Sequence, residues 1–192
     1  MPRNTGMDYT VVRNGEYSRS RVGNIERHNE RKNQQYSNQD VQLEKSDLNF
    51  YFKKPEGGYL ETFDKMCESG KISTKGLKPE ATIMDEFLFD VNTEYFEKHG
   101  GYDFALEFFQ KVYEYAVKEV GGEEYILSAV MHADERNQEV SERLGKDVYH
   151  YHLHVMYIPV VEKEVRWTKR CKDVEKRGTI KEIITQVSHS KK

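Results

Sequence analysis

The segment YHYHLHVMYIPVV, at residues 149–161, restricts the fold more than any other part of the chain. In an extended strand successive side chains point to opposite faces, so residues two apart share a face. The residues that share one face are His150, His152 and His154. Leu153 and Val155 then point into a core behind them. The segment predicts a strand with one apolar face and one face lined with histidines.

Apolar side chains at helical spacing mark the segment 102–120 as a helix packed on a core. They recur at positions 105, 108, 109, 112, 113, 116 and 120. Gly121-Gly122 ends this helix, and a strand is expected at 124–131. The earlier segment TIMDEFLFDV, at 82–91, also predicts a strand because its apolar residues alternate.

The first half of the chain gives weaker signals. We expect short strands at 8–13 and 48–52 and a helix at 59–70. Between residues 14 and 45 aliphatic residues are scarce and Asn, Gln, Ser and Arg abundant, which indicates irregular surface structure, with a helical turn over 25–33.

Two charged segments lie in the second half. The segment 136–147 separates the two late strands and predicts a surface loop, and 163–192 predicts a short strand or loop followed by a helix. Strands interleaved with helices predict an α+β sandwich with a largely antiparallel sheet. We expect one domain over 1–192, with 163–192 as a basic C-terminal extension.

The composition excludes several classes of protein. Hydrophobic residues make up 36% and charged residues 33%, which is typical of a soluble globular protein. No apolar run approaches the roughly 20 residues that span a bilayer, and the polar start lacks the apolar stretch of a secretion signal. A cytoplasmic protein is therefore expected. Cys67 and Cys171 are isolated, which argues against a disulfide framework or a zinc ribbon.

The net charge of −3 conceals an uneven distribution. Residues 1–32 carry 7 Lys/Arg against 4 Asp/Glu, and residues 163–192 carry 10 against 4. The middle of the chain is strongly acidic. A nucleic-acid partner is compatible with this pattern if the two basic ends converge on one face.

The histidine strand predicts a metal site. Residues at i and i+2 have Cα atoms about 6.5–7 Å apart, so the rings of His152 and His154 can converge on one ion. Antiparallel pairing of 124–131 with 152–159 would bring His132 alongside as a third ligand, followed by Asp134 and Glu135. Three imidazoles leave coordination positions open, as in catalytic sites.

Two other interpretations of the histidines remain open at this point. The strand face could be merely solvated, with His132 a chance neighbour. His150 could be a bystander, a residue supporting the ligands or one facing DNA. Imidazole ligands do not choose the metal, because they suit zinc, nickel and iron as readily as manganese.

His28-Asn29-Glu30-Arg31 lies in the polar region, and alone it is a weak signal that fits a solvated charged turn better than a catalytic motif. Three motifs together are more specific. They are HNERKNQQYSNQDVQLEKSDLNFYF at 28–52, MHADE at 131–135 and HLHVMYIPV at 152–160. In this order they resemble the Mob/Pre plasmid mobilisation and recombination relaxases of the HUH endonuclease superfamily, from about residue 8 to at least 160.

The resemblance implies an enzyme that nicks one strand at a plasmid transfer origin, joins covalently to the 5′ phosphate and later religates it. It implies a palm-like sandwich, with His132, His152 and His154 holding Mn²⁺ or Mg²⁺. It assigns His28 as nucleophile, Glu135 as an acid that orients or activates it, and Arg31 to the same motif. Tyr17 or Tyr36 could serve as nucleophile instead, because tyrosine has that role in most of the superfamily.

The basic residues outside the metal site are candidates for DNA binding. Lys75 and Lys78 stand where relatives carry basic residues near the DNA. The remaining candidates for the DNA backbone are Arg19, Arg21, Arg27, Arg31, Lys169, Arg170 and Lys172. Trp167 is a candidate platform for base stacking. A solvated basic helix is the alternative.

The chain departs from the family pattern in two places. Sixteen residues separate Glu135 from His152, where relatives commonly have only a few, and this insertion is expected to alter DNA contacts rather than the ligands. Many relatives also continue into a long helical tail that this chain lacks, so a homodimer through such a missing region is possible.

Three other functions fit part of this pattern. A rolling-circle replication initiator shares the chemistry but acts at a replication origin. A metal-stabilised DNA-binding module would bind without cleavage. A zinc hydrolase would turn over small phosphodiesters and ignore DNA sequence.

Overall fold

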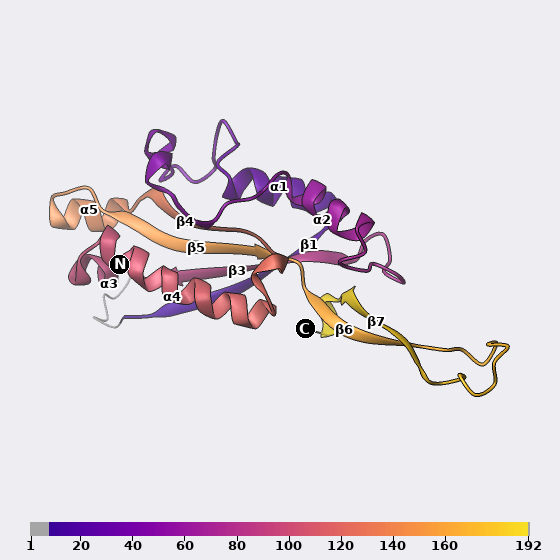
Figure 1. Cartoon of the computed structure of the whole chain (residues 1–192). Coiled ribbons are helices and arrows are strands. Elements are labelled where there is room, and N and C mark those ends of the chain that lie inside the picture. Colours follow the sequence, from indigo (N-terminus) through magenta and orange to yellow (C-terminus); the bar gives the residue numbers. More distant parts are fainter. Residues whose placement is uncertain (1–7, 192) are drawn as a thin grey trace.

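The structure is a computed structural model that describes residues 8–191. Its centre is a five-stranded sheet whose neighbouring strands are all antiparallel (Figure 1). In spatial order the strands are β1 (Thr10–Ser18), β3 (Thr82–Val91), β5 (Tyr149–Tyr157), β4 (Ile126–Arg136) and β2 (Phe50–Lys53). The predicted α+β class with an antiparallel sheet is confirmed.

Helices cover both faces of this sheet (Figure 1). One face carries α1 (Arg19–Asn29) and α2 (Tyr59–Glu68), and the other carries α3 (Thr93–His99) and α4 (Tyr102–Val120). A short helix, α5 (Gln138–Leu144), lies beyond the end of β4. Three 3₁₀ turns complete the described elements: η1 (Leu43–Leu48), η2 (Glu123–Tyr125) and η3 (His189–Lys191).

Strand β5 lies in the middle of the sheet, between β3 and β4. Leu153 and Val155 are completely buried against the α4 face, as the period-two pattern predicts. Pairing of β4 with β5 is antiparallel, and His132 lies directly opposite His152. The register on which the metal hypothesis depends is therefore confirmed.

Helix α4 spans the predicted residues and buries the predicted stripe. Phe109, Ala116 and Val120 are fully buried in the core beneath β5. Fully burying a side chain as large as Phe109 contributes about 1.5–3 kcal/mol. Gly121 and Gly122 end the helix with φ values of +89° and +145°, which a residue with a side chain rarely adopts.

The N-terminal polar region is more ordered than its composition indicates. β1 runs on to Ser18, and α1 follows it for 11 residues. The expected single turn at 25–33 is the C-terminal part of this helix. The expectation of irregular structure was wrong here because two aliphatic side chains fix α1 on the sheet. Val22 is 0% exposed and packs among residues of α2 and β3, and the partly buried Ile25 packs against the same cluster.

The insertion after β4 is also partly helical. Asn137 caps α5 by accepting a hydrogen bond from the Val140 amide at 3.0 Å, and Gly145 ends the helix at φ +65°. A surface loop was predicted for this segment. The expectation failed because Val140 finds a buried position that the surrounding charges concealed.

Of the C-terminal expectation, the short strand is confirmed and the helix that should follow it is wrong. In place of a helix, β6 (Val160–Arg166) and β7 (Ile180–Val187) form a separate two-stranded antiparallel ribbon that projects from the sheet (Figure 1). The β-branched residues around 179–187 favour a strand. Likewise β5 ends at Tyr157 rather than 161, because Pro159 has no amide hydrogen for the ladder. No helix within residues 8–191 is long and apolar enough to cross a membrane.

His189 fastens the chain just after the ribbon to the sheet. Its Nδ1 lies 2.9 Å from a carboxylate oxygen of buried Asp85, and its Nε2 lies 3.2 Å from Glu16. The hydrogen bond and charge of Asp85 raise the pKa of His189 above its usual value, although burial opposes the shift. Protonated His189 therefore stabilises the folded chain.

This arrangement predicts a pH-dependent contribution to stability. Because the pKa of His189 is raised on folding, its contribution is complete below the unfolded pKa of about 6.5 and is lost as pH rises through the folded value. The difference in Tm between the wild type and His189→Gln should be largest near pH 6 and shrink at alkaline pH. Thermal unfolding followed by circular dichroism measures it. A difference that grows with pH would contradict the assignment.

Candidate metal and catalytic site

Three histidines meet on the sheet face beneath α1. His132 lies on β4, and His152 and His154 lie on β5. All three are buried, and their ring centroids are 4.6–5.1 Å apart. The structure thus brings together the three residues predicted as ligands from sequence.

The ring nitrogens have the chemistry that a metal ion requires. Nδ1 of His132 lies 3.2 Å from Nε2 of His152. Two nitrogens that each lie about 2.1 Å from one ion would be separated by a similar distance. Nε2 of His154 is buried and has no hydrogen-bond partner among the described residues. Burial lowers the pKa of His132 and of His152, which keeps these rings neutral with their lone pairs available.

Two overlapping sets of possible ligands share His132. Donor atoms of His28, His132 and His154 lie within 4.8 Å of one another, and so do those of His132, Glu135 and His152. The residues present therefore fit a divalent ion. They also leave open whether His28 acts as a ligand or as a reactant beside the ion.

Hydrogen bonds behind the rings fix which nitrogen faces the site. His154 Nδ1 donates to Glu86 at 2.8 Å, and His132 Nε2 donates to the backbone carbonyl of Asn29 at 2.9 Å. Each ring therefore keeps its other nitrogen free as a lone pair. Partners of this kind orient ligands and increase their basicity.

Sequence reasoning missed Glu86. It is 4% exposed and also accepts hydrogen bonds from Asn29 Nδ2 at 2.7 Å and from the Tyr17 hydroxyl at 2.8 Å. Burial alone would raise its pKa, but the charge and hydrogen bond of His154 outweigh burial and hold the pKa below its usual value. The available signal was a carboxylate in the middle of the apolar strand TIMDEFLFDV.

His28 occupies the last turn of α1, above the cluster. Its ring centroid lies 5.6 Å from that of His154 and 5.9 Å from that of His132. Burial, together with the positive charges of His154 and Arg31, lowers the pKa of His28 to about 4. At neutral pH this ring is therefore uncharged and carries a lone pair, as a nucleophile or a metal ligand must.

Arg31 joins the end of α1 to β4. It has a left-handed backbone with φ +48°, which is uncommon for a residue other than glycine. Its guanidinium donates to both oxygens of Asp134, at 2.7 and 2.9 Å, and to Glu135 at 2.8 Å. Consecutive strand residues usually point to opposite faces, but a bulge between His132 and Glu135 lets both carboxylates reach Arg31.

Asp134 is completely buried and serves as a hub. Besides Arg31, it accepts hydrogen bonds from the Ser46 hydroxyl at 2.8 Å and the Asn49 amide at 2.9 Å. Burial alone would raise its pKa, and the hydrogen bonds and charge of Arg31 hold it below the usual value. The sequence identified Asp134 only as an acid near His132.

The contacts of Glu135 differ from the expected ones. Its carboxylate accepts from Arg31 and from Asn38 Nδ2 at 3.1 Å, and it lies 3.7 Å from His152 Nε2. Within the described residues no hydrogen bond joins Glu135 to His28. Glu135 is thus placed to act on the ligand side of the site.

The alternative nucleophiles lie at different distances from the cluster. The ring of Tyr36 packs edge-on against His28 with centroids 5.9 Å apart, and its hydroxyl donates to the backbone carbonyl of Arg27. The Tyr17 hydroxyl donates to Glu86, and burial together with this carboxylate raises the pKa of Tyr17.

His150 lies on the same strand as His152 and His154 but has other partners. Its Nδ1 is hydrogen-bonded to the Thr93 hydroxyl at 3.0 Å, and its Nε2 lies 3.2 Å from a carboxylate oxygen of Asp90.

A polar hollow of about 660 Å³ adjoins the site. Its lining residues are Asn38, Asp40, Glu135, Arg136, Asn137, Gln138, Glu139, Glu142 and His150. The residues from 136 to 142 belong to the insertion. The insertion therefore forms part of the wall next to Glu135 without supplying any of the candidate ligands.

The predicted DNA-binding residues fall into separate groups. Arg19, Arg21 and Arg27 lie on α1, where Arg19 is ion-paired with Asp64. Lys75 and Lys78 lie in the loop before β3. The remaining predicted residues, Trp167, Lys169, Arg170 and Lys172, lie at the far end of the ribbon. Within residues 8–191, the basic residues of α1 and those of the ribbon tip thus lie apart and form no single patch (Figure 1).

Comparisons with known proteins agree on one family. The model of the Mob_Pre family, described as plasmid recombination enzyme, matches residues 7–192. A plasmid recombination enzyme of Streptococcus agalactiae is 26% identical over 131 residues, which are 67% of this chain and 26% of that protein. One of Lactiplantibacillus plantarum is 22% identical over 94% of this chain and 46% of its own length. The chain therefore spans about a quarter to a half of these relatives.

Solved structures share the fold. The Mn-bound MobM relaxase domain in complex with pMV158 oriT DNA at pH 6.8 superposes with a TM-score of 0.65 and 23% identity. The match covers 80% of this chain and 71% of MobM. A Mn-bound MobM complex at pH 5.5 gives a TM-score of 0.63, also at 23% identity. Since the family model extends over nearly the whole sequence, this chain belongs to the Mob_Pre family of plasmid recombination enzymes.

Proposed function

We propose that this chain is a relaxase domain that nicks and rejoins one DNA strand at the transfer origin of a plasmid or other mobile element in the cytoplasm. The observation that supports it best is the neutral, half-buried His28 beside the buried cluster of His132, His152 and His154. Relatives named plasmid recombination enzymes, and the DNA-bound MobM relaxase domain, support the same function.

The ligand set proposed is His132, His152 and His154, with Mn²⁺ or Mg²⁺ as the ion. Mn is the metal of the MobM complexes. When bound, such an ion polarises a non-bridging oxygen of the scissile phosphate and offsets charge in the transition state. Glu86 and the Asn29 carbonyl hold the rings of His154 and His132 in the orientation that this requires.

His28 is the proposed nucleophile. A ring nitrogen attacks the scissile phosphorus, the bond from phosphorus to the 3′ oxygen breaks, and that oxygen leaves and takes up a proton. The 5′ phosphate of the DNA remains joined to His28 through a phosphorus–nitrogen bond. A 3′ hydroxyl can then attack the same phosphorus, loses its proton, restores the phosphodiester and releases His28.

Arg31 has two roles in this proposal. Its charge offsets those of Asp134 and Glu135, which would otherwise repel a phosphate. Its Nη1 is buried and has no hydrogen-bond partner among the described residues, so it remains a donor for a phosphate oxygen. Glu135 orients Arg31 and lies near His152, so its expected effect on His28 is indirect.

The proposed function predicts which substitutions abolish strand cleavage. On a supercoiled plasmid that carries the element's own transfer origin, His28→Ala and His152→Ala should each lower the nicking rate on the order of 10³-fold or more. Tyr36→Phe and Tyr17→Phe serve as controls and should keep most of the activity. Agarose gels separate nicked from supercoiled plasmid, and mass spectrometry identifies the residue joined to DNA. An adduct on a tyrosine, or full activity of His28→Ala, would refute the assignment.

A further prediction tests whether His28 acts as the nucleophile or as a metal ligand. In Mn²⁺ titrations by calorimetry, His152→Ala should weaken binding at least tenfold, whereas His28→Ala should leave affinity nearly unchanged. Glu86→Gln removes the carboxylate behind His154 and should weaken Mn²⁺ binding about 10–100-fold. A loss in His28→Ala equal to that in His152→Ala would mean that His28 binds the ion, as the first overlapping set allows.

A further inference from the structure

The ribbon formed by β6 and β7 is the part of the molecule that the proposed chemistry does not use. It projects away from the sheet and ends in the segment 167–179 (Figure 1). Outside its base, nearly all of its side chains are exposed, including the large apolar Ile183 at 60%. A two-stranded ribbon is marginally stable on its own. Because most of this ribbon lies outside the core, we look for a function rather than a structural role.

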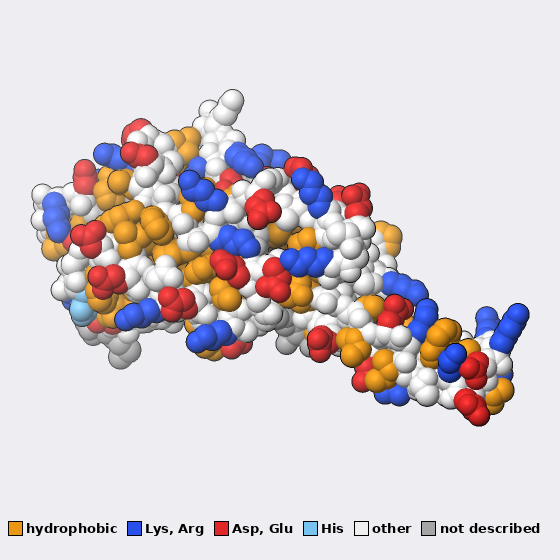
Figure 2. Space-filling view, in the orientation of Figure 1, with side chains coloured by type: hydrophobic (Ala, Val, Ile, Leu, Met, Phe, Trp, Pro, Cys, Tyr) orange, Lys and Arg blue, Asp and Glu red, His pale blue; other side chains and the backbone are white. Residues whose placement is uncertain are grey.

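Positive charge is concentrated at the end of the ribbon. The strands β6 and β7 carry three Lys/Arg and three Asp/Glu, whereas 167–179 carries five Lys/Arg and two Asp/Glu. Lys176 pairs with Asp173, but no Asp or Glu among the described residues lies within 4 Å of Lys169 or Lys172. Figure 2 shows several blue Lys and Arg side chains at this extremity, among fewer red ones.

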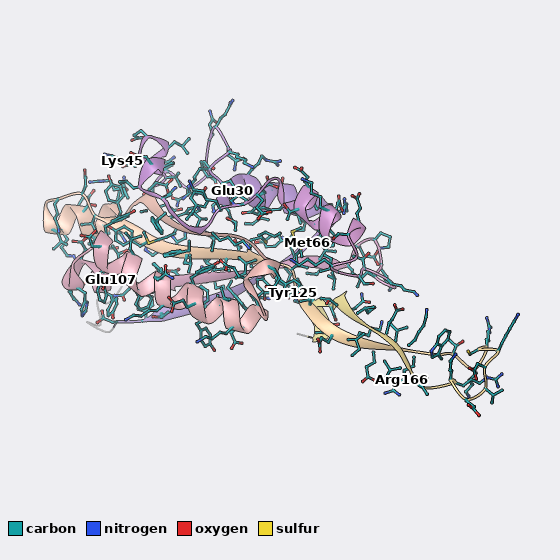
Figure 3. The ribbon with its side chains drawn as sticks, viewed as in Figure 1. Glu30, Lys45, Met66, Glu107, Tyr125 and Arg166 are labelled. Carbon is teal, nitrogen blue, oxygen red and sulfur yellow. The ribbon has the colours of Figure 1, made fainter. Side chains whose placement is uncertain are left out.

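The ribbon is fixed at its base. The Ser73 amide donates a hydrogen bond to the Thr185 carbonyl of β7 at 2.7 Å. The Ser73 carbonyl accepts a second one from the Val187 amide at 2.9 Å. The Ser188 amide also donates to the carbonyl of Pro159. The ribbon therefore leaves the sheet in a defined direction, and Figure 3 shows Arg166 already clear of the main body.

The tip has the chemistry of a phosphate-binding surface rather than of a base-stacking one. Proteins that hold single strands stack bases on aromatic rings. Trp167, the one aromatic residue of 167–179, is half-buried and has the Lys181 ammonium 5.3 Å from its ring centroid. Duplex DNA presents about one charge per 1.7 Å of axis, which suits exposed lysines without stacking.

We propose that the tip, residues 167–179, is a second DNA-contacting surface that binds the phosphates of duplex DNA beside the strand to be cut. The inference rests on the proposed function for the identity of the DNA. Seven residues of β6 extend about 23 Å at 3.3 Å per residue. With a rise of about 3.4 Å per base pair, the tip contacts DNA roughly seven base pairs beyond the edge of the sheet.

The test compares two pairs of exposed lysines. Lys169→Ala/Lys172→Ala removes tip charge, and Lys111→Ala/Lys118→Ala removes the same charge from α4. Binding of a fluorescein-labelled 20-base-pair duplex and of a 20-nucleotide single strand is measured by anisotropy across NaCl concentrations. The tip variant should weaken duplex binding at least fivefold and reduce the slope of log K against log salt by about 1.8. Single-strand binding should change less than twofold, and the α4 variant should match the wild type.

Three results would overturn the inference: no duplex binding by the wild type, no effect of the tip variant, or an equal effect of the α4 variant. Equal losses for duplex and single strand would overturn the assignment to duplex. If duplex binding depends on the tip but the protein nicks no DNA, the proposed function alone is refuted. If the protein nicks DNA but the tip variant binds duplex as the wild type does, this inference alone is refuted.

Discussion

The buried ion pair between Arg31 and Asp134 is the contact on which the site depends. Arg31 follows the last turn of α1, which carries His28 and Asn29, and Asp134 follows His132 on β4. One pair of side chains therefore sets the distance between the proposed nucleophile and the proposed ligands. Removing one partner of such a pair typically costs about 3–5 kcal/mol, because the other charge is left buried. Arg31 makes this pair from a left-handed backbone, with φ +48°.

Around this pair the site combines hydrogen-bonded carboxylates with uncharged imidazole rings. Two buried carboxylates, of Glu86 and Asp134, and the half-buried carboxylate of Glu135 lie near the histidines, yet each is hydrogen-bonded to a defined donor. Burial lowers the pKa values of His28, His132 and His152, which keeps these three rings uncharged. Glu30 contributes differently: it lies between α1 and the sheet (Figure 3) and accepts hydrogen bonds from the hydroxyls of Tyr51, Tyr59 and Ser128, at distances of 2.9, 2.5 and 2.8 Å. The HNER motif thus combines a reactive ring with two residues that fasten it.

The sequence predicted those features that depend on period and on local pairing. The two faces of β5, the extent of α4 and the meeting of His132 with His152 follow from alternation, helical spacing and antiparallel register. Glu86 could not be assigned, since its importance comes from a neighbouring strand whose order in the sheet was unreadable. Strand β7 was mistaken for a helix because isoleucines at 180, 183 and 184 fit a helical spacing, and only the pairing of β7 with β6 reveals the difference. The role of Asp134 depends on a bulge that no local pattern announces.

The separation of the ribbon tip from the metal site follows from the same electrostatics. Further cations placed beside Glu86, Asp134 and Glu135 would pair with these carboxylates and would no longer be available to a DNA phosphate. Pro159 ends the pairing of β5, and the ribbon then carries Lys169, Arg170 and Lys172 about 23 Å beyond the end of the sheet. This exceeds the Debye length of about 8 Å at physiological salt, so the two regions do not neutralise each other. An acidic chain can thereby combine a carboxylate-rich site with a cationic surface for nucleic acid.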